Sequence, residues 1–150
     1  MMKTVLKTMK TSISEVMETM FFLPVEFSEE PSQKEIKAIK GRRNKTCRLD
    51  FSGDCSGSVY LLVPTELLSQ MAENFIGEPA ESLGDDILHG TLTETVNMTA
   101  GNALRKLKVA APFDLGIPEL VLGTQFPETA GTLIIKTPGP QMAVHITLWC

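Results

Sequence analysis

The spacing of apolar residues predicts two long helices, one in each half of the chain. From Val5 to Phe22, apolar side chains recur every three or four residues, which places them on one helix face. A second stretch with this spacing starts near Asp86 and continues to Leu107. Leu23-Pro24 ends the first helix, because proline cannot continue it. A shorter helix, capped by Thr65, is expected to run to about Phe75.

Alternation of apolar and polar residues predicts the strands. The expected strands are 45–51, 58–63, 119–126, 131–137 and 143–149. The turn at 52–57 joins the first two strands into a hairpin. Segments rich in proline, glycine or acidic residues are predicted to be loops or irregular; these are 26–32, 77–85 and 112–118.

Two short similarities within the chain indicate an internal repeat. Residues 57–64 and 131–138 share a glycine, a small hydroxyl residue, a run of β-forming residues and a final proline. Upstream of each, Glu15-Val-Met-Glu18-Thr-Met20 resembles Glu94-Thr-Val-Asn97-Met-Thr99. Two similarities in the same order favour duplication of a helix–hairpin unit over a chance match.

Composition restricts the class of protein. A chain of 150 residues with 43% hydrophobic and 21% charged residues is expected to form one domain, 1–150. The net charge of −4 argues against nucleic-acid binding, and the basic cluster 40–45 is interpreted as a solvated turn. Three cysteines without a CxxC motif indicate neither a disulfide framework nor a zinc site. The sequence shows no membrane span or signal peptide, so a cytoplasmic location is expected.

Glu94 and Asn97 are the candidate functional residues. They are three residues apart, so on a helix they share one face, about 60° apart and opposite the apolar stripe. Gly90 and Gly101 flank the pair on nearly the same line. Each glycine costs a helix interior about 1 kcal/mol relative to alanine. Close approach of a partner's backbone would explain why both are present.

Further residues near this face extend the candidate interface. Ile87 and Met98 lie beside the pair, and Arg105 and Lys108 follow one to two turns later. Exposed apolar side chains next to a polar pair are typical of a protein interface. Contact with a neighbouring loop or with a second copy of the chain explains them equally well.

Glu94-x-x-Asn97, followed by Met-Thr-Ala-Gly101-Asn-Ala-Leu, resembles the signature helix of the CheC/CheX family of chemotaxis phosphatases. The resemblance implies an α+β fold, in which a pseudo-twofold helix–hairpin repeat packs long helices on an antiparallel sheet. It also implies hydrolysis of the phospho-aspartate of CheY-type response regulators. A single Glu-x-x-Asn agrees with the CheX-like branch, whose members carry one active helix per chain and form homodimers. The chain departs from the family pattern at Gly90, where Asp or Ser is usual, and at Pro118, which comes about two residues early.

For such a reaction we expect Asn97 to orient the attacking water and Glu94 to pair with a lysine of the receiver domain. The partner-binding residues are predicted to be Glu94, Gly90, Met98, Gly101 and Arg105. The chain is expected to hold no metal or cofactor of its own, so Mg²⁺ would come from the receiver. The alternative is a non-catalytic interaction module that docks a receiver or a signalling or flagellar complex. Which response regulator is the target stays open.

Overall fold

The structure is a computed structural model that describes residues 1–107 and 111–149. Within these residues, seven strands form one antiparallel sheet in the order β1-β6-β7-β3-β2-β4, and β5 also pairs with β2. The strands are β1 (Glu26–Glu29), β2 (Asn44–Ser52), β3 (Ser56–Pro64), β4 (Asp114–Leu115), β5 (Glu119–Val121), β6 (Thr132–Lys136) and β7 (Met142–Trp149).

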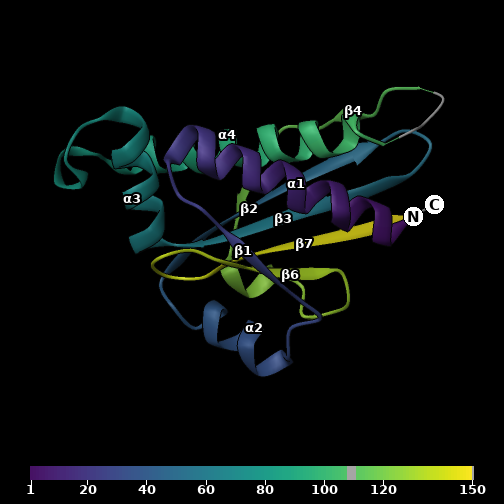
Figure 1. Cartoon of the computed structure of the whole chain (residues 1–150), viewed down its shortest axis with the longest axis horizontal. Helices are drawn as coiled ribbons and strands as arrows, with labels where there is room; N and C mark the ends of the chain where they lie inside the picture. The colour runs from purple at the N-terminus through teal and green to yellow at the C-terminus, as the bar shows by residue number, and fades with distance from the viewer. Residues whose placement is uncertain (108–110, 150) are drawn as a thin grey trace.

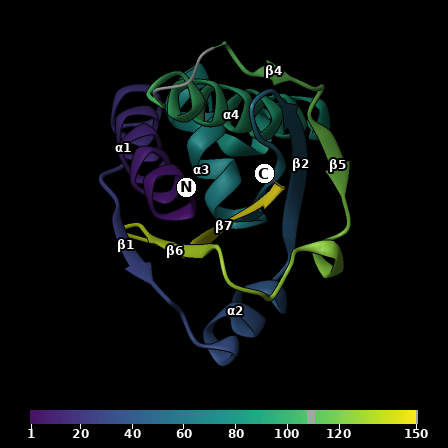
Figure 2. The ribbon, with the colours of Figure 1, turned by 90° about the vertical axis from the view of Figure 1, so that its right-hand side faces the viewer.

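Helices cover both faces of this sheet. They are α1 (Met2–Phe21), α2 (Gln33–Lys40), α3 (Thr65–Ile76) and α4 (Asp85–Arg105), with 3₁₀ turns at Ala80–Ser82 and Gly123–Gln125. Helices α1, α3 and α4 lie on one face, whereas α2 packs on the other, as the two views show (Figures 1 and 2). This arrangement confirms the predicted α+β fold with long helices on an antiparallel sheet.

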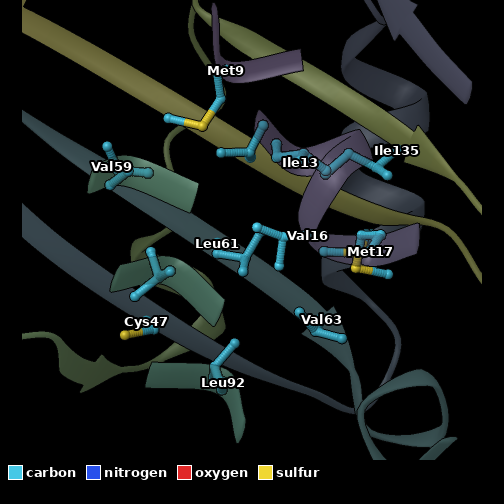
Figure 3. Packing of buried hydrophobic residues seen from close by; sticks show 14 of the residues in the cluster. Met9, Ile13, Val16, Met17, Cys47, Val59, Leu61, Val63, Leu92 and Ile135 are labelled. Carbon is cyan, nitrogen blue, oxygen red and sulfur yellow. The ribbon is translucent and has the colours of Figure 1, made fainter. Parts of the chain in front are cut away.

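The main core lies between the sheet and helices α1, α3 and α4. Apolar residues of α1, including Met9, Ile13 and Met17, face Leu61 of β3 and Leu92 of α4 (Figure 3). All five are at most 1% exposed. A smaller cluster under α2 contains Ile36, Ile39, Leu62, Phe126, Ile134 and Ala143. The apolar residues of the helices and strands therefore face the core, as their spacing in the sequence predicts.

The strand order has the symmetry expected of a duplicated unit. Each half contributes one long helix, an outer strand and a hairpin, and β3 and β7 meet at the centre of the sheet. The similarity between 57–64 and 131–138 does not follow this symmetry, because it matches β3 with β6, whereas β7 is the counterpart of β3. Both glycines of that pattern, Gly57 and Gly131, instead lie against β7, where a Cβ atom would collide with a β7 carbonyl oxygen.

Two elements of the first half differ from the sequence-based prediction. Residues 26–32 were expected to be a loop, but Glu26–Glu29 form the edge strand β1, which pairs with β6. Its pairing partner lies more than a hundred residues away, so the local sequence does not reveal it. Helix α2 was not predicted, although Ser32 and Glu35 form a capping box at its start, with Glu35 N–H bonded to Ser32 Oγ at 3.2 Å.

Two smaller expectations are corrected, and a third is confirmed except for two residues. Thr65 does not cap α3: Pro64 occupies the N-cap, and the buried Thr65 hydroxyl has no hydrogen-bond partner among the described residues. The strand predicted over 119–126 ends at Val121 and continues into a 3₁₀ turn, because only its first three residues pair with β2. The segment 112–118 is irregular as expected, apart from the two residues of β4.

The two described cysteines are in different states. Cys55 is disulfide-bonded, which the odd number of cysteines did not indicate. Cys47 is a free, fully buried thiol, and burial raises its pKa to about 11. Cys150 and the predicted interface residue Lys108 lie outside the described residues. Among the helices that the structure describes, none is both long and apolar enough to cross a membrane.

Candidate functional site

Helix α4 presents Glu94 and Asn97 to solvent. Its apolar stripe is buried against the sheet and α1, with Leu92, Val96 and Ala100 each 0% exposed. Glu94 and Asn97 are exposed on the opposite side, as the spacing predicts. The side chains of both residues are without a hydrogen-bond or ion-pair partner in the described part of the chain. Both polar groups are therefore available to a partner molecule.

Buried hydrogen bonds on the inner side of α4 support the segment that carries Glu94 and Asn97. Ser12 of α1 is fully buried, and its Oγ donates to the carbonyl oxygen of Thr99 at 2.7 Å. The Thr95 and Thr99 hydroxyls each donate to a carbonyl oxygen one turn earlier, at 2.6 and 2.8 Å. The buried Ser12 bond links α1 to α4 and restricts the rotation of α4, whereas the two threonine bonds lie within α4. The two exposed side chains thus project from a rigid support.

A groove of about 290 Å³ runs along one side of the pair. Glu94, Gly90 and Met98 line it from α4, as do Asp86, Ile87 and Thr91. The opposite wall consists of the last residues of α1 and α3, Met20, Phe21, Phe75 and Ile76. We call this feature the α1–α3–α4 groove. Figure 1 shows the ends of α1 and α3 approaching α4 at the same side of the molecule.

The structure separates the predicted partner-binding residues into two groups. Gly101 and Arg105 line a different depression, with Leu104, Leu107 and the segment 111–115. Asn97 lines neither hollow, because it lies on the ridge of α4 between them. Arg105 is about 16 Å along the helix axis from Glu94 and donates to Asn102. Glu94, Gly90 and Met98 therefore line one hollow, and Gly101 and Arg105 line another further along α4.

The corresponding pair on α1 has a different environment. Glu15 of α1 forms an ion pair with Lys106 at the C-cap of α4, with Nζ and Oε1 3.1 Å apart. Glu18 is exposed but offers a carboxylate where α4 offers the Asn97 amide. One carboxylate of the α1 pair is thus engaged in an ion pair, and this pair carries one more negative charge than the Glu94–Asn97 pair of α4. Of these two helices, only α4 presents an uncommitted carboxylate next to a neutral amide.

The Glu94–Asn97 pair is better suited to orienting a water molecule and docking a partner than to forming a covalent bond. An exposed amide can align a water molecule without adding charge, and an exposed carboxylate can bind a cation of a partner. The described residues contain no group of three or more His, Cys, Asp or Glu side chains that could hold a metal ion.

Sequence reasoning missed the apolar wall of the groove. Phe75 and Ile76 are 53% and 42% exposed, and Phe22, directly after α1, is 72% exposed. The available signal was that aromatic residues stand at the ends of two helices, just before the breakers Pro24 and Gly77. Nothing in the local sequence indicates that these two ends meet beside Glu94.

Solved structures with the same fold are chemotaxis proteins and related assemblies. Chemotaxis protein CheX from Vibrio vulnificus superimposes with a TM-score of 0.77 at 18% identity, covering 97% of this chain and 96% of its own. The CheX–CheY–BeF3–Mg complex from Borrelia burgdorferi gives 0.73 at 18% identity, covering 95% and 96%. The FliM–SpeE complex from H. pylori gives 0.63 at 8% identity, covering 96% and 83%. At these identities the likeness shows the fold alone.

Sequence comparison identifies the family. No curated protein sequence matches this chain significantly. The family model described as chemotaxis phosphatase CheX matches residues 45–136, a region that spans β2 to β6 and includes Glu94 and Asn97. This match covers more than half of the 150 residues. The chain therefore belongs to the CheX family.

Proposed function

We propose that this protein is a phosphatase that hydrolyses the phospho-aspartate of a CheY-type response regulator. The observation that carries the proposal is the exposed, uncommitted Glu94–Asn97 pair on a helix whose other side is buried in the core. Membership of the CheX family supports it. The structure of a related CheX with CheY, BeF3 and Mg supports a CheY-type partner.

Asn97 is proposed to orient the attacking water. Hydrolysis of an acyl phosphate needs a water in line with phosphorus and an environment that tolerates the charge of the transferring group. The amide oxygen of Asn97 accepts a hydrogen bond from that water, and the neutral amide does not repel the phosphoryl oxygens. Orientation alone could lower the barrier by several kcal/mol. A carboxylate at this position would oppose the approach of the dianion.

Glu94 is proposed to pair with a lysine of the receiver domain. Such a pair becomes partly desolvated on binding and determines the docking register. The Mg²⁺ of the reaction is proposed to belong to the receiver, because the chain offers no set of metal ligands among its described residues. The protein then supplies one amide and one carboxylate to a site that is otherwise built by its substrate.

A non-catalytic docking module is the second candidate. Gly90 stands where the resemblance leads us to expect Asp or Ser, so an accessory polar contact is missing. The same fold occurs in a FliM–SpeE complex, a protein–protein assembly. In this case Glu94 and Asn97 would bind a receiver or another signalling protein without accelerating hydrolysis.

Homodimer formation and a cytoplasmic location complete the proposal. Ile117 and Leu122 are 85% and 71% exposed next to β5, and Leu120 of this strand is 44% exposed. Within the described residues β5 pairs only with β2, so its other edge is open to a second copy. Sedimentation of the wild type and of Leu120→Lys tests this part, and a wild-type monomer at micromolar concentration would contradict it.

The decay of a phosphorylated CheY-type receiver from the same cell tests the activity. Wild-type protein should accelerate the decay, and Asn97→Ala should abolish the acceleration while binding persists. Asn102→Ala, the same change on the same helix but outside the pair, serves as the matched control and should remain active. Unchanged decay despite measurable receiver binding would establish the docking module instead.

A further inference from the structure

An exposed apolar cluster surrounds the α1–α3–α4 groove. Ten large apolar side chains are exposed in the described part of the chain. Three of them, Phe75, Ile76 and Ile87, line the groove, and Phe22 directly follows its lining residue Phe21. Phe22 is 72% exposed, Phe75 53%, Ile76 42% and Ile87 39%. They come from three helix segments that the fold brings together. Contiguous apolar surface of this kind marks an interaction site more often than isolated exposed side chains do.

The backbone at Phe22 adds a second observation. Phe22 follows the last residue of α1 with φ 56° and ψ 34°, the left-handed conformation that usually belongs to glycine at this position. A Cβ atom makes this conformation unfavourable, and a large aromatic residue there is rare. The ring gains little in return from the fold, since it is mostly in solvent. Strain combined with exposure points to a role outside the folded chain.

The charges that line the α1–α3–α4 groove indicate which kind of partner segment binds there. Its charged lining residues are Asp86 and Glu94, both acidic, and the other described lining residues are apolar or uncharged. A segment that fits must therefore present an apolar side chain together with a basic group. Glu94 belongs both to this lining and to the proposed phosphatase pair, so the groove is continuous with the place where phosphorus would be bound.

We infer that the α1–α3–α4 groove is the docking site for an aromatic or aliphatic side chain of the receiver domain, flanked by a lysine or arginine that faces Asp86 and Glu94. This inference rests on the proposed function and deepens it. The receiver would lie across α4, with its phospho-aspartate at Asn97 and its apolar anchor on the far side of Gly90. Buried aromatic anchors in pockets commonly contribute most of the affinity of an interface.

Phe22→Gly gives a test in which stability and binding move in opposite directions. Glycine relieves the left-handed backbone, so the variant should unfold at the same or a higher temperature than the wild type. It also removes an exposed aromatic ring next to the lining residue Phe21, which is expected to contact the receiver's anchor, so the KM for the phosphorylated receiver should rise at least about tenfold with kcat unchanged. Glu30→Gly is the matched control, because Glu30 also has a positive φ, 53°, but lies away from the groove. Its KM should not change.

Charge reversal provides an independent pair of variants. Asp85 and Asp86 are neighbours in the first turn of α4, and only Asp86 lines the groove. Asp86→Lys should weaken receiver binding about tenfold and reduce its salt dependence, whereas Asp85→Lys should change affinity much less. Both changes affect the helix dipole alike, so stability does not explain a difference between them.

Receiver binding and phosphoryl decay are measured separately for every variant. Unchanged KM and affinity in both Phe22→Gly and Asp86→Lys would overturn the inference, even if the wild type is an active phosphatase. A change of these variants from dimer to monomer, with receiver affinity retained, would also overturn it, because the groove would then bind a second copy. Groove-dependent binding without accelerated decay would leave the inference standing and contradict the proposed catalysis.

Discussion

Gly90→Ala should stabilise the fold and impair the partner interaction at the same time. Gly90 is exposed in the interior of α4, and a Cβ atom built there has nothing within 4 Å. Its backbone is helical, so alanine can adopt it without strain. No contact within the described chain therefore requires a glycine at this position.

The size of both effects follows from this environment. Replacing glycine by alanine inside an exposed helix is worth about 1 kcal/mol of stability. For a chain of this length that corresponds to a rise of about 2–4 °C in Tm. Gly90 lines the α1–α3–α4 groove, so alanine would add a methyl group to its wall. If a partner's backbone packs against Gly90, the overlap should cost about 1–3 kcal/mol of binding, or about 5- to 150-fold in KM.

Two assays on one protein preparation measure the stability and the partner binding of Gly90→Ala. Urea unfolding gives the free energy of unfolding, and the dependence of decay rate on receiver concentration gives KM. Gly101→Ala is the control for folding, since its Cβ would contact Leu115 Cδ1 at an ordinary 3.5 Å. It should stabilise the fold by a similar amount.

The effects of Gly90→Ala on stability and on binding are refuted by different results. A destabilised Gly90→Ala variant would show that α4 is not a regular exposed helix at this point. A stabilised variant with unchanged KM would refute the idea that a partner's backbone approaches Gly90. In that case the glycine would have no function that the structure can explain.

Further predictions concern the support of the site and the buried titrating groups. Burial lowers the pKa of His145 to about 4, so protonation favours the unfolded chain, and stability should fall between pH 6.5 and 4 by up to about 3 kcal/mol. Urea titrations across this range should show a smaller fall for His145→Gln, and an equal fall would refute this origin. Ser12→Ala removes the buried bond to Thr99 and should cost about 1 kcal/mol in urea unfolding, unless another donor replaces it. Leu92→Ala should cost about 2–5 kcal/mol by the same assay, and a smaller loss would indicate that the core collapses around the cavity. Cys47, with its raised pKa, should resist alkylation at neutral pH until the protein unfolds, and rapid labelling of the native state would contradict its burial.

Much of the candidate site was predictable because it lies within one helix. The positions of Glu94 and Asn97 follow from helical periodicity, since neighbouring apolar residues determine which side is buried. The exposed state of both residues confirms this prediction. The roles of the two residues stay predictions. Gly101 and Arg105 were grouped with them by the same periodicity, but the helical wheel carries no information about which elements stand on either side of α4.

By itself, the sequence determined the long helices, the two hairpins and the orientation of Glu94 and Asn97, because each depends on residues close together in the chain. Only the tertiary structure decided that Glu26–Glu29 becomes an edge strand, since its partner β6 is remote. It also decided that the ends of α1 and α3 meet beside Gly90 to form a groove. Such contacts depend on how separate elements pack, and local periodicity does not encode that packing.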